Sequence, residues 1–274
     1  MNNYKTKKVM KKLASLLTCI CLILSTTACS QSKNYSSGNW GSKKVIASNK
    51  YVTKDIKVDN FKKISVAGSP DVTFTQKSGR PEVEVYTSDN IVDLLDIKVK
   101  DNTLYIGFKK DVNVSYKKLE VRVSAETLNG ISVAGSGDIK GSGIKCNDMK
   151  VSVAGSGDIN ADNITCNNLK VSVAGSGDMV LRNVTATGTE ASVAGSGSAT
   201  ITGTTQTATY SVAGSGDLLT EGYEAQRVTA SVAGSGSIKC FATEFLKART
   251  SGSGKIGYKG NPELDYPKKS LYKL

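Results

Sequence analysis

The chain has 274 residues, of which 39% are hydrophobic and only 6% aromatic, with 27 glycines, no histidine and a formal net charge of +12. The lack of histidine excludes Ser-His and Cys-His nucleophilic dyads and removes the commonest transition-metal ligand. Five lysines and no acids lie in residues 1–28, so the net charge of the chain without this segment is 12 − 5 = +7. The remaining lysines are scattered along the chain. We therefore expect no nucleic-acid partner, because such binding favours a concentrated basic stripe.

Residues 1–28 have the pattern of a signal peptide. Lysines up to Lys12 precede an apolar run over residues 13–24, which is too short to span a bilayer but has the length of a signal-peptide core. Ala28 and Cys29 then resemble the bacterial lipobox, although Thr26 stands where that motif usually has leucine. The resemblance implies cleavage before Cys29 and its lipidation with palmitate or a similar acyl chain. The alternative is an ordinary secretory signal that is cleaved near Ala28.

Residues 29–50 are rich in serine, asparagine, glycine and lysine and are predicted to form a flexible tether. Residues 51–130 are predicted to form an irregular β region that caps the rest of the chain, with one helix-like stretch at 91–95. Strands are expected where apolar and polar residues alternate between turn-forming residues. These runs are 55–58, 61–66, 72–76, 82–86, 97–100, 104–108 and 119–123.

From residue 131 to 274 the chain is organised by a repeat with a period of about 20 residues. Six copies of S-V-A-G-S-G begin at Ser132, Ser152, Ser172, Ser192, Ser211 and Ser231. A divergent copy begins at Arg249, and an early one, S-V-A-G-S-P, begins at Ser65. Glycine doublets and β-branched residues argue against helices, and such a period is typical of stacked repeats. We predict an all-β fold, a single-stranded parallel β-helix or β-solenoid with ~20-residue rungs, preceded by the irregular β region.

Within one rung the alternation predicts which side chains point inward. Val151 and Val153 should face the core, and Ser152 should face solvent, before the chain turns at the glycine pair. Residues 61–72 (F-K-K-I-S-V-A-G-S-P-D-V) together with the A-G-S-G-D-I rungs resemble the auto-transporter adhesin "head GIN" domain family, over about residues 54–260. The resemblance implies a β-helical envelope protein, often with a lipoprotein leader, and it provides no catalytic residues.

An aspartate follows four of the six Gly-Ser-Gly corners, at Asp138, Asp158, Asp178 and Asp217. A calcium ladder is conceivable, but the calcium-binding nonapeptide has one more residue between glycine and aspartate. We interpret these residues as corner aspartates that bond to nearby backbone, and we predict no metal site, no cofactor and no catalytic residue.

Cys146 and Cys166 both lie 14 residues after the serine that opens their rung, so they should stack on neighbouring rungs. A spacing of about 4.8 Å between parallel strands would allow a disulfide between them. The alternative is a pair of inward thiols that fill space which later rungs fill with Ala186 and Phe245. Cys240 should belong to a different column.

These patterns predict a cell-envelope lipoprotein, anchored to the membrane by lipid and expected at the outer membrane, with its periplasmic or surface face left open. Its solenoid would serve as a binding, adhesion-like or structural module without catalysis, and the glycan or protein ligand is not defined. The alternative is a carbohydrate-active enzyme, a polysaccharide lyase or hydrolase on a β-helix scaffold. A cluster of Asp, Arg and Lys that breaks the repeat in one groove would favour the enzyme.

Overall fold

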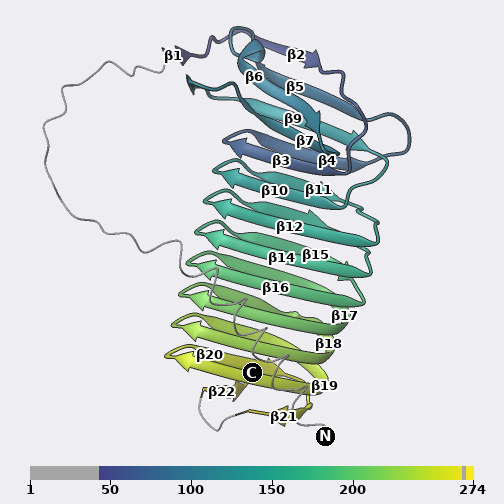
Figure 1. Ribbon diagram of the computed structural model, residues 1–274, viewed down its shortest axis with the longest axis vertical. Helices are drawn as coiled ribbons and strands as arrows, with labels where there is room; N and C mark the ends of the chain where they lie inside the picture. Colours follow the sequence, from purple (N-terminus) through teal and green to yellow (C-terminus); the bar gives the residue numbers. More distant parts are fainter. Residues whose placement is uncertain (1–42, 267–269) are drawn as a thin grey trace, which may run out of the picture. The chain divides into compact units, whose positions relative to one another are not determined.

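The computed structural model describes residues 43–266 and 270–274. The predicted signal peptide, Cys29 and most of the predicted tether lie outside these residues. The described chain consists of β-strands and one short 3₁₀ helix, η1 (Val92–Leu94), at the helix-like stretch. The strands form a β-solenoid of about seven turns, which confirms the predicted fold class (Figure 1). Within the described ranges, no helix has the length and apolar character needed to cross a membrane.

The strands divide into an N-terminal group and a stacked group. The N-terminal group is β1 (Lys43–Ile46), β2 (Tyr51–Asp55), β5 (Glu82–Ser88), β6 (Leu95–Lys100), β7 (Thr103–Phe108), β8 (Val112–Ser115) and β9 (Leu119–Ala125). The stacked group begins with β3 (Lys63–Gly68), β4 (Asp71–Gln76), β10 (Gly130–Gly135), β11 (Ile139–Ser142), β12 (Asp148–Gly155), β13 (Ile159–Asp162), β14 (Asn168–Gly175) and β15 (Met179–Thr185). It continues with β16 (Gly188–Gly195), β17 (Ser198–Gly214), β18 (Asp217–Gly234), β19 (Ser237–Gly252), β20 (Lys255–Lys259), β21 (Glu263–Asp265) and β22 (Leu271–Lys273).

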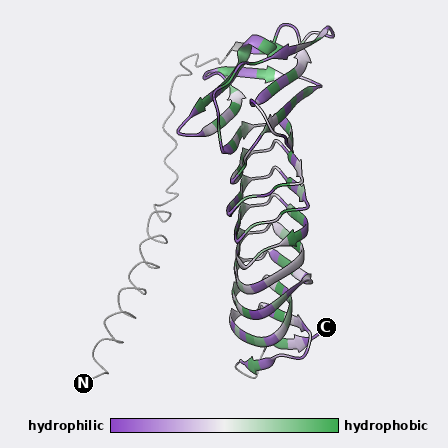
Figure 2. Cartoon of the chain, turned by 90° about the vertical axis from the view of Figure 1, so that its right-hand side faces the viewer, coloured by the Kyte–Doolittle hydropathy of each residue, from purple (hydrophilic) through white to green (hydrophobic). Residues whose placement is uncertain are grey.

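Each coil lies parallel to the next with the repeat in register. Val151 pairs with Val171, Ser152 with Ser172 and Val153 with Val173. The valines are buried and the serines are half-buried on the outer face, so the predicted inward and outward phase is confirmed. Hydropathy alternates along the strands accordingly (Figure 2). The core is a continuous column of Val, Ile, Leu and Ala that no single coil could bury alone.

The Gly-Ser-Gly corner needs both glycines because adjacent coils approach closely there. Gly155 has a φ of +132°, and a Cβ at this position would overlap the carbonyl oxygen of Gly135 in the preceding coil. That same oxygen accepts hydrogen bonds from the backbone N–H groups of Ser156 and Gly157, at 2.8 and 2.9 Å. The corner is therefore a backbone-to-backbone contact that leaves no room for a side chain.

The solenoid begins earlier in the chain than the repeat count indicated. Strand β3 pairs in register with β10, so that Ser65 lies beside Ser132, and β4 pairs with β11. The stack thus includes residues 63–76, which lie inside the segment that the sequence predicts to be an irregular β cap. Strands β7 and β9 pair with the other edges of β3 and β4, so the β3–β4 coil is inserted between segments that come later in the sequence.

The N-terminal cap differs from the prediction at its start. Strand β2 spans Tyr51–Asp55 and pairs antiparallel with β5, so the strand lies earlier than the expected run at 55–58. Strand β1, inside the segment predicted as tether, pairs with β8, a strand that the sequence did not indicate. The folded unit is therefore already present at Lys43.

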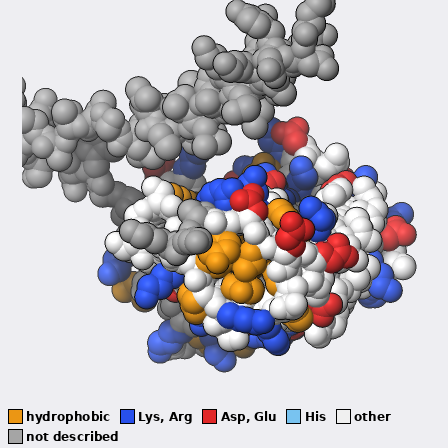
Figure 3. All heavy atoms as spheres, turned by 90° about the horizontal axis from the view of Figure 1, so that it is seen from below, with side chains coloured by type: hydrophobic (Ala, Val, Ile, Leu, Met, Phe, Trp, Pro, Cys, Tyr) orange, Lys and Arg blue, Asp and Glu red, His pale blue; other side chains and the backbone are white. Residues whose placement is uncertain are grey.

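The C-terminal end of the stack has fewer covering strands than the N-terminal end. Strand β22 pairs with β20 along one edge. Apolar side chains gather in the middle of this end, and charged groups surround them (Figure 3). The exposed large apolar residues that the last segment contributes are Tyr266, Tyr272 and Leu274.

Candidate binding surface

The corner aspartates form a hydrogen-bonded ladder. The Oδ1 atom of Asp138 accepts from the backbone N–H of Asp158 at 3.0 Å, and Oδ1 of Asp158 accepts from that of Asp178 at 2.8 Å. Asp178 accepts both the N–H and the hydroxyl of Ser198, and Asp217 does the same for Ser237. Each carboxylate thus satisfies a backbone donor of the next coil, in agreement with the interpretation as corner residues. Across the described ranges, no group of three potential ligands could hold a metal ion.

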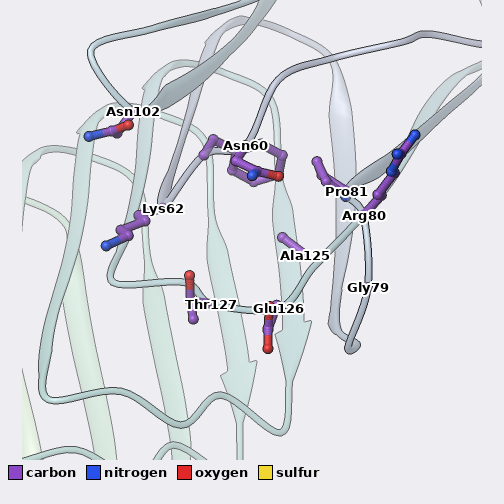
Figure 4. Close-up of a pocket in the computed structure, with 10 residues that line it drawn as sticks. Asn60, Lys62, Gly79, Arg80, Pro81, Asn102, Ala125, Glu126 and Thr127 are labelled. Atoms are coloured by element: carbon purple, nitrogen blue, oxygen red, sulfur yellow. The ribbon is translucent and has the colours of Figure 1, made fainter.

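The repeat is broken most visibly where the chain leaves the β3–β4 coil. The loop after β4, the entry to β3 and the segment after β9 enclose a depression of about 400 Å³. It contains charged residues, namely Lys62, Arg80 and Glu126, together with Asn60 and Asn102. Their charged ends point in different directions and do not converge on a common point (Figure 4). A glycan-cleaving site needs converging acid and base groups, so this depression does not favour the enzyme alternative.

A second departure from the repeat lies on the outer face of the sheet that β3, β10, β12 and β14 form. Two residues before each repeat serine, the stack carries Lys63, Gly130, Lys150 and Lys170 side by side in consecutive coils. We call this row the lysine row. The neighbouring row is Ser65, Ser132 and Ser152, and Tyr105 of β7 takes the place of serine at its N-terminal end.

Two shallow depressions lie along these rows. The first, of about 240 Å³, is lined by the outer residues from Tyr105 to Lys150. The second, of about 580 Å³, shares Lys63 and Lys150 with it and extends to Glu190. The sequence did not reveal this surface, because the pattern of residues 51–130 predicts an irregular β cap and not a regular coil of the repeat. Alignment of the early S-V-A-G-S-P copy with the later ones would have placed Lys63 in the lysine row and shown that Gly130 interrupts it.

The structure holds Cys146, Cys166 and Cys240 as free thiols. Lys145 pairs with Thr165 and Asp148 with Asn168, which places Cys146 beside Cys166 as expected from the spacing. Burial raises the pKa of the Cys166 thiol to about 12 and also raises that of Cys146. The disulfide between these two residues stays a prediction.

The later residues of this cysteine column differ from those predicted. The column continues through Ala186, as expected, and then through Thr205, Ala225 and Ala242. Phe245 instead pairs with Arg227, whose guanidinium lies 4.7 Å from the centre of the Phe245 ring. The register shifts between Thr220 and Glu224, where β18 has three more residues than β19, and this shift makes the fixed count of 14 wrong in that coil. Cys240 pairs with Thr220, in a different column as predicted.

These features define a parallel β-solenoid whose described surface offers shallow depressions and regular rows of side chains. More particularly, residues 60–262 match the family described as "Putative auto-transporter adhesin, head GIN domain", and the chain belongs to that family. The resemblance found in the sequence is thereby confirmed.

Solved structures share the fold. A crystal structure of a "putative lipid binding protein" from Parabacteroides distasonis is 27% identical with a TM-score of 0.80, over 85% of this chain and 100% of that one. A "putative adhesin" from the same species has the same identity and TM-score, over 84% and 100% of the two chains. A "putative adhesin" from Bacteroides fragilis is 31% identical with a TM-score of 0.64, over 84% and 95%. No curated protein matches the chain.

Proposed function

We propose that this protein is a lipid-anchored module of the bacterial cell envelope that binds an external ligand through the outer faces of its solenoid. The observation that carries the proposal is the match to an adhesin family over residues 60–262. Relatives of known structure are named adhesins, and one is named a lipid binding protein. The proposal assigns no catalysis, because the charged groups at the main break in the repeat do not converge.

The anchor is proposed to be Cys29, which comes after an apolar leader and a small residue. Acyl chains on this residue would hold the protein at the membrane, and two or more chains give stable anchoring. In cells labelled with palmitate, the wild-type protein should carry label and require detergent for release. Cys29→Ala should lose the label and leave a folded, soluble solenoid.

Cys21→Ala is the matched control, because it removes a leader cysteine without touching the proposed cleavage site. It should keep both the label and the need for detergent. Wild-type protein that carries no label, or that washes from membranes without detergent, would contradict the anchor.

The binding role is tested with the full-length protein in mild detergent on an array of glycans, matrix proteins and lipid vesicles. A saturable ligand that is recovered unchanged supports the proposed function. Release of shorter fragments from a bound polysaccharide would instead support the enzyme alternative.

A further inference from the structure

The first depression on the lysine row combines a gap with unpaired positive charge. Gly130 has no side chain, and a Cβ there would lie 3.0 Å from Cγ of Lys63. The Lys63 stem therefore lies over Gly130, and a hollow remains between it and Lys150 two coils away, about 9.6 Å along the stack. Between Lys63 and Lys170 the row is interrupted at Gly130 only, and the coil after Lys170 has Glu190 at this position.

The two lysines that border this depression have no local counter-charge. Among residues 43–266 and 270–274, neither Lys63 nor Lys150 has an ion-pair partner, whereas Lys170 contacts Glu190 at 3.0 Å. Lys100 of β6 extends the same face, because it pairs with Thr103 next to Lys63. Asp148, two residues before Lys150, accepts hydrogen bonds from the side-chain amides of Asn147 and Asn168, one at each carboxylate oxygen.

An aromatic ring borders the hollow. Tyr105 is 38% exposed, and its strand partner is Ser65, so the ring stands where the coils from Ser65 to Ser231 have a small serine. An exposed tyrosine offers a flat apolar face together with a polar tip. The serines beside it, with Thr103, supply hydroxyl groups to the same depression.

We infer that this depression, formed by Tyr105, Lys63, Gly130 and Lys150, binds an acidic polysaccharide. The inference rests on the proposed binding function and names its site and ligand class. A sugar ring would stack on Tyr105, its hydroxyls would bond to the serines, and its carboxylate or sulfate groups would contact Lys63 and Lys150. The polymer extends along the stack, so that repeated weak contacts add through multivalency.

Other macromolecules fit this surface less well. An extended peptide binds a sheet by adding to a free edge, but the strands here are already paired in register on both sides. Single-stranded nucleic acid needs several aromatic platforms for successive bases, and Tyr105 is the one aromatic residue that lines the depression.

The test measures binding of the full-length protein in mild detergent to four probes: polygalacturonate, dextran sulfate, neutral dextran and single-stranded DNA. Polygalacturonate and dextran sulfate separate carboxylate from sulfate recognition. At least one of them should bind saturably, with an affinity that falls as salt rises, and neutral dextran and DNA should bind at least tenfold more weakly.

Three variants locate the site. Lys63→Gln with Lys150→Gln should weaken binding of the acidic polymer at least tenfold. Gly130→Leu fills the hollow without a change of charge and should weaken it several-fold, and Tyr105→Ser should do the same. The matched control is Lys140→Gln with Lys145→Gln, which removes the same charge from exposed positions outside the depression and should change affinity less than twofold.

Equal losses in the two lysine pairs, or no effect of Gly130→Leu and Tyr105→Ser, would show non-specific charge attraction and overturn the inference. DNA binding as tight as that of the polymers would overturn the ligand class. A protein that binds another ligand on the array but neither acidic polymer would overturn this inference and leave the proposed function standing.

Discussion

The carboxylate of Asp158 accepts the backbone N–H of Asp178, one coil later, at 2.8 Å. Asp158 in turn donates its own backbone N–H to Asp138. The aspartate after the corner thus acts as an acceptor between coils, and the side chains of Asp138, Asp158 and Asp178 form one stretch of a hydrogen-bonded column. A serine can end a stretch of the column, as Ser198 does by donating twice to Asp178.

We predict that Asp158→Ala lowers the free energy of unfolding by about 1 kcal/mol, because it leaves the N–H of Asp178 without its acceptor. Asp158→Asn retains a side-chain oxygen and should cost less than Asp158→Ala. Urea unfolding of both variants checks this. An alanine variant as stable as the wild type would show that water replaces the carboxylate without loss.

The glycine corner gives a sharper contrast. Gly155→Ala places a Cβ against the carbonyl oxygen of Gly135 and forces alanine to a φ of +132°. We expect it to cost roughly 2–3 kcal/mol or more, since neither backbone can yield. Ser156→Ala, at the exposed residue between the glycines, should stay within about 0.5 kcal/mol. The same unfolding measurement compares the pair, and similar effects would contradict the close approach of the coils.

The inward and outward phase is tested by neighbouring residues. Val153 is 1% exposed and lies between valines of adjacent coils, so Val153→Asp buries an unpaired charge and should cost several kcal/mol. Ser152→Asn on the outer face should cost well under about 1 kcal/mol. Circular dichroism during thermal unfolding distinguishes them, and equal shifts in Tm would refute the assigned phase.

The parts of the fold that depend on local pattern could be read from the sequence. Alternation of valine and serine with a fixed glycine corner determines the period, the phase and the parallel stacking, because each depends on residues within one rung. The place of the β3–β4 coil could not be read in this way. Its partners β10 and β11 lie more than 60 residues later in the chain, across the inserted cap strands.

The candidate site shows the same limit. The Lys150 and Lys170 positions are visible in the regular repeat and Lys63 in its early copy, but Tyr105 joins them only through the pairing of β7 with β3. The fixed count that misplaced Phe245 failed for a related reason, because the register shifts after Thr220, where β19 has three residues fewer than β18 before the pairing resumes at Glu224. Counting along the chain gives columns only while every coil has the same length.

The last regular coil should respond to acid. Hydrogen bonding to Arg249 lowers the pKa of Asp265, and Lys247 adds to this effect. A carboxyl with a depressed folded pKa contributes stability that is present above its unfolded pKa and lost as pH falls through the folded value. We therefore expect the hydrogen-exchange protection factors of β19 and β21, taken against the intrinsic exchange rate at each pH, to fall below about pH 3.9. In Asp265→Asn this pH dependence should be weaker, and an unchanged profile would show that the Arg249 contact does not hold the coil.

The cysteines provide the last prediction. A chain that starts at Ser30 retains only Cys146, Cys166 and Cys240. Cys166 and Cys240 are buried, and burial raises the pKa of each to about 12, so the reactive thiolate is scarce at pH 8. Folded protein should therefore react slowly with a thiol reagent, Cys146 first because it is half-buried, and faster as pH rises toward 12.

After denaturation without reductant, the free thiols separate the two states that the spacing allows. Three free thiols mean that Cys146 and Cys166 pack side by side without a bond, as they do in the structure. Parallel stacking favours this state, since it aims both side chains inward and not at each other. One thiol means that Cys146 and Cys166 are bridged in the oxidising envelope. Cys146→Ser is the control, because it leaves Cys166 and Cys240 and should give two free thiols in either case. The count should therefore fall from three to two if the wild-type pair is unbonded, and rise from one to two if the wild-type pair is bridged.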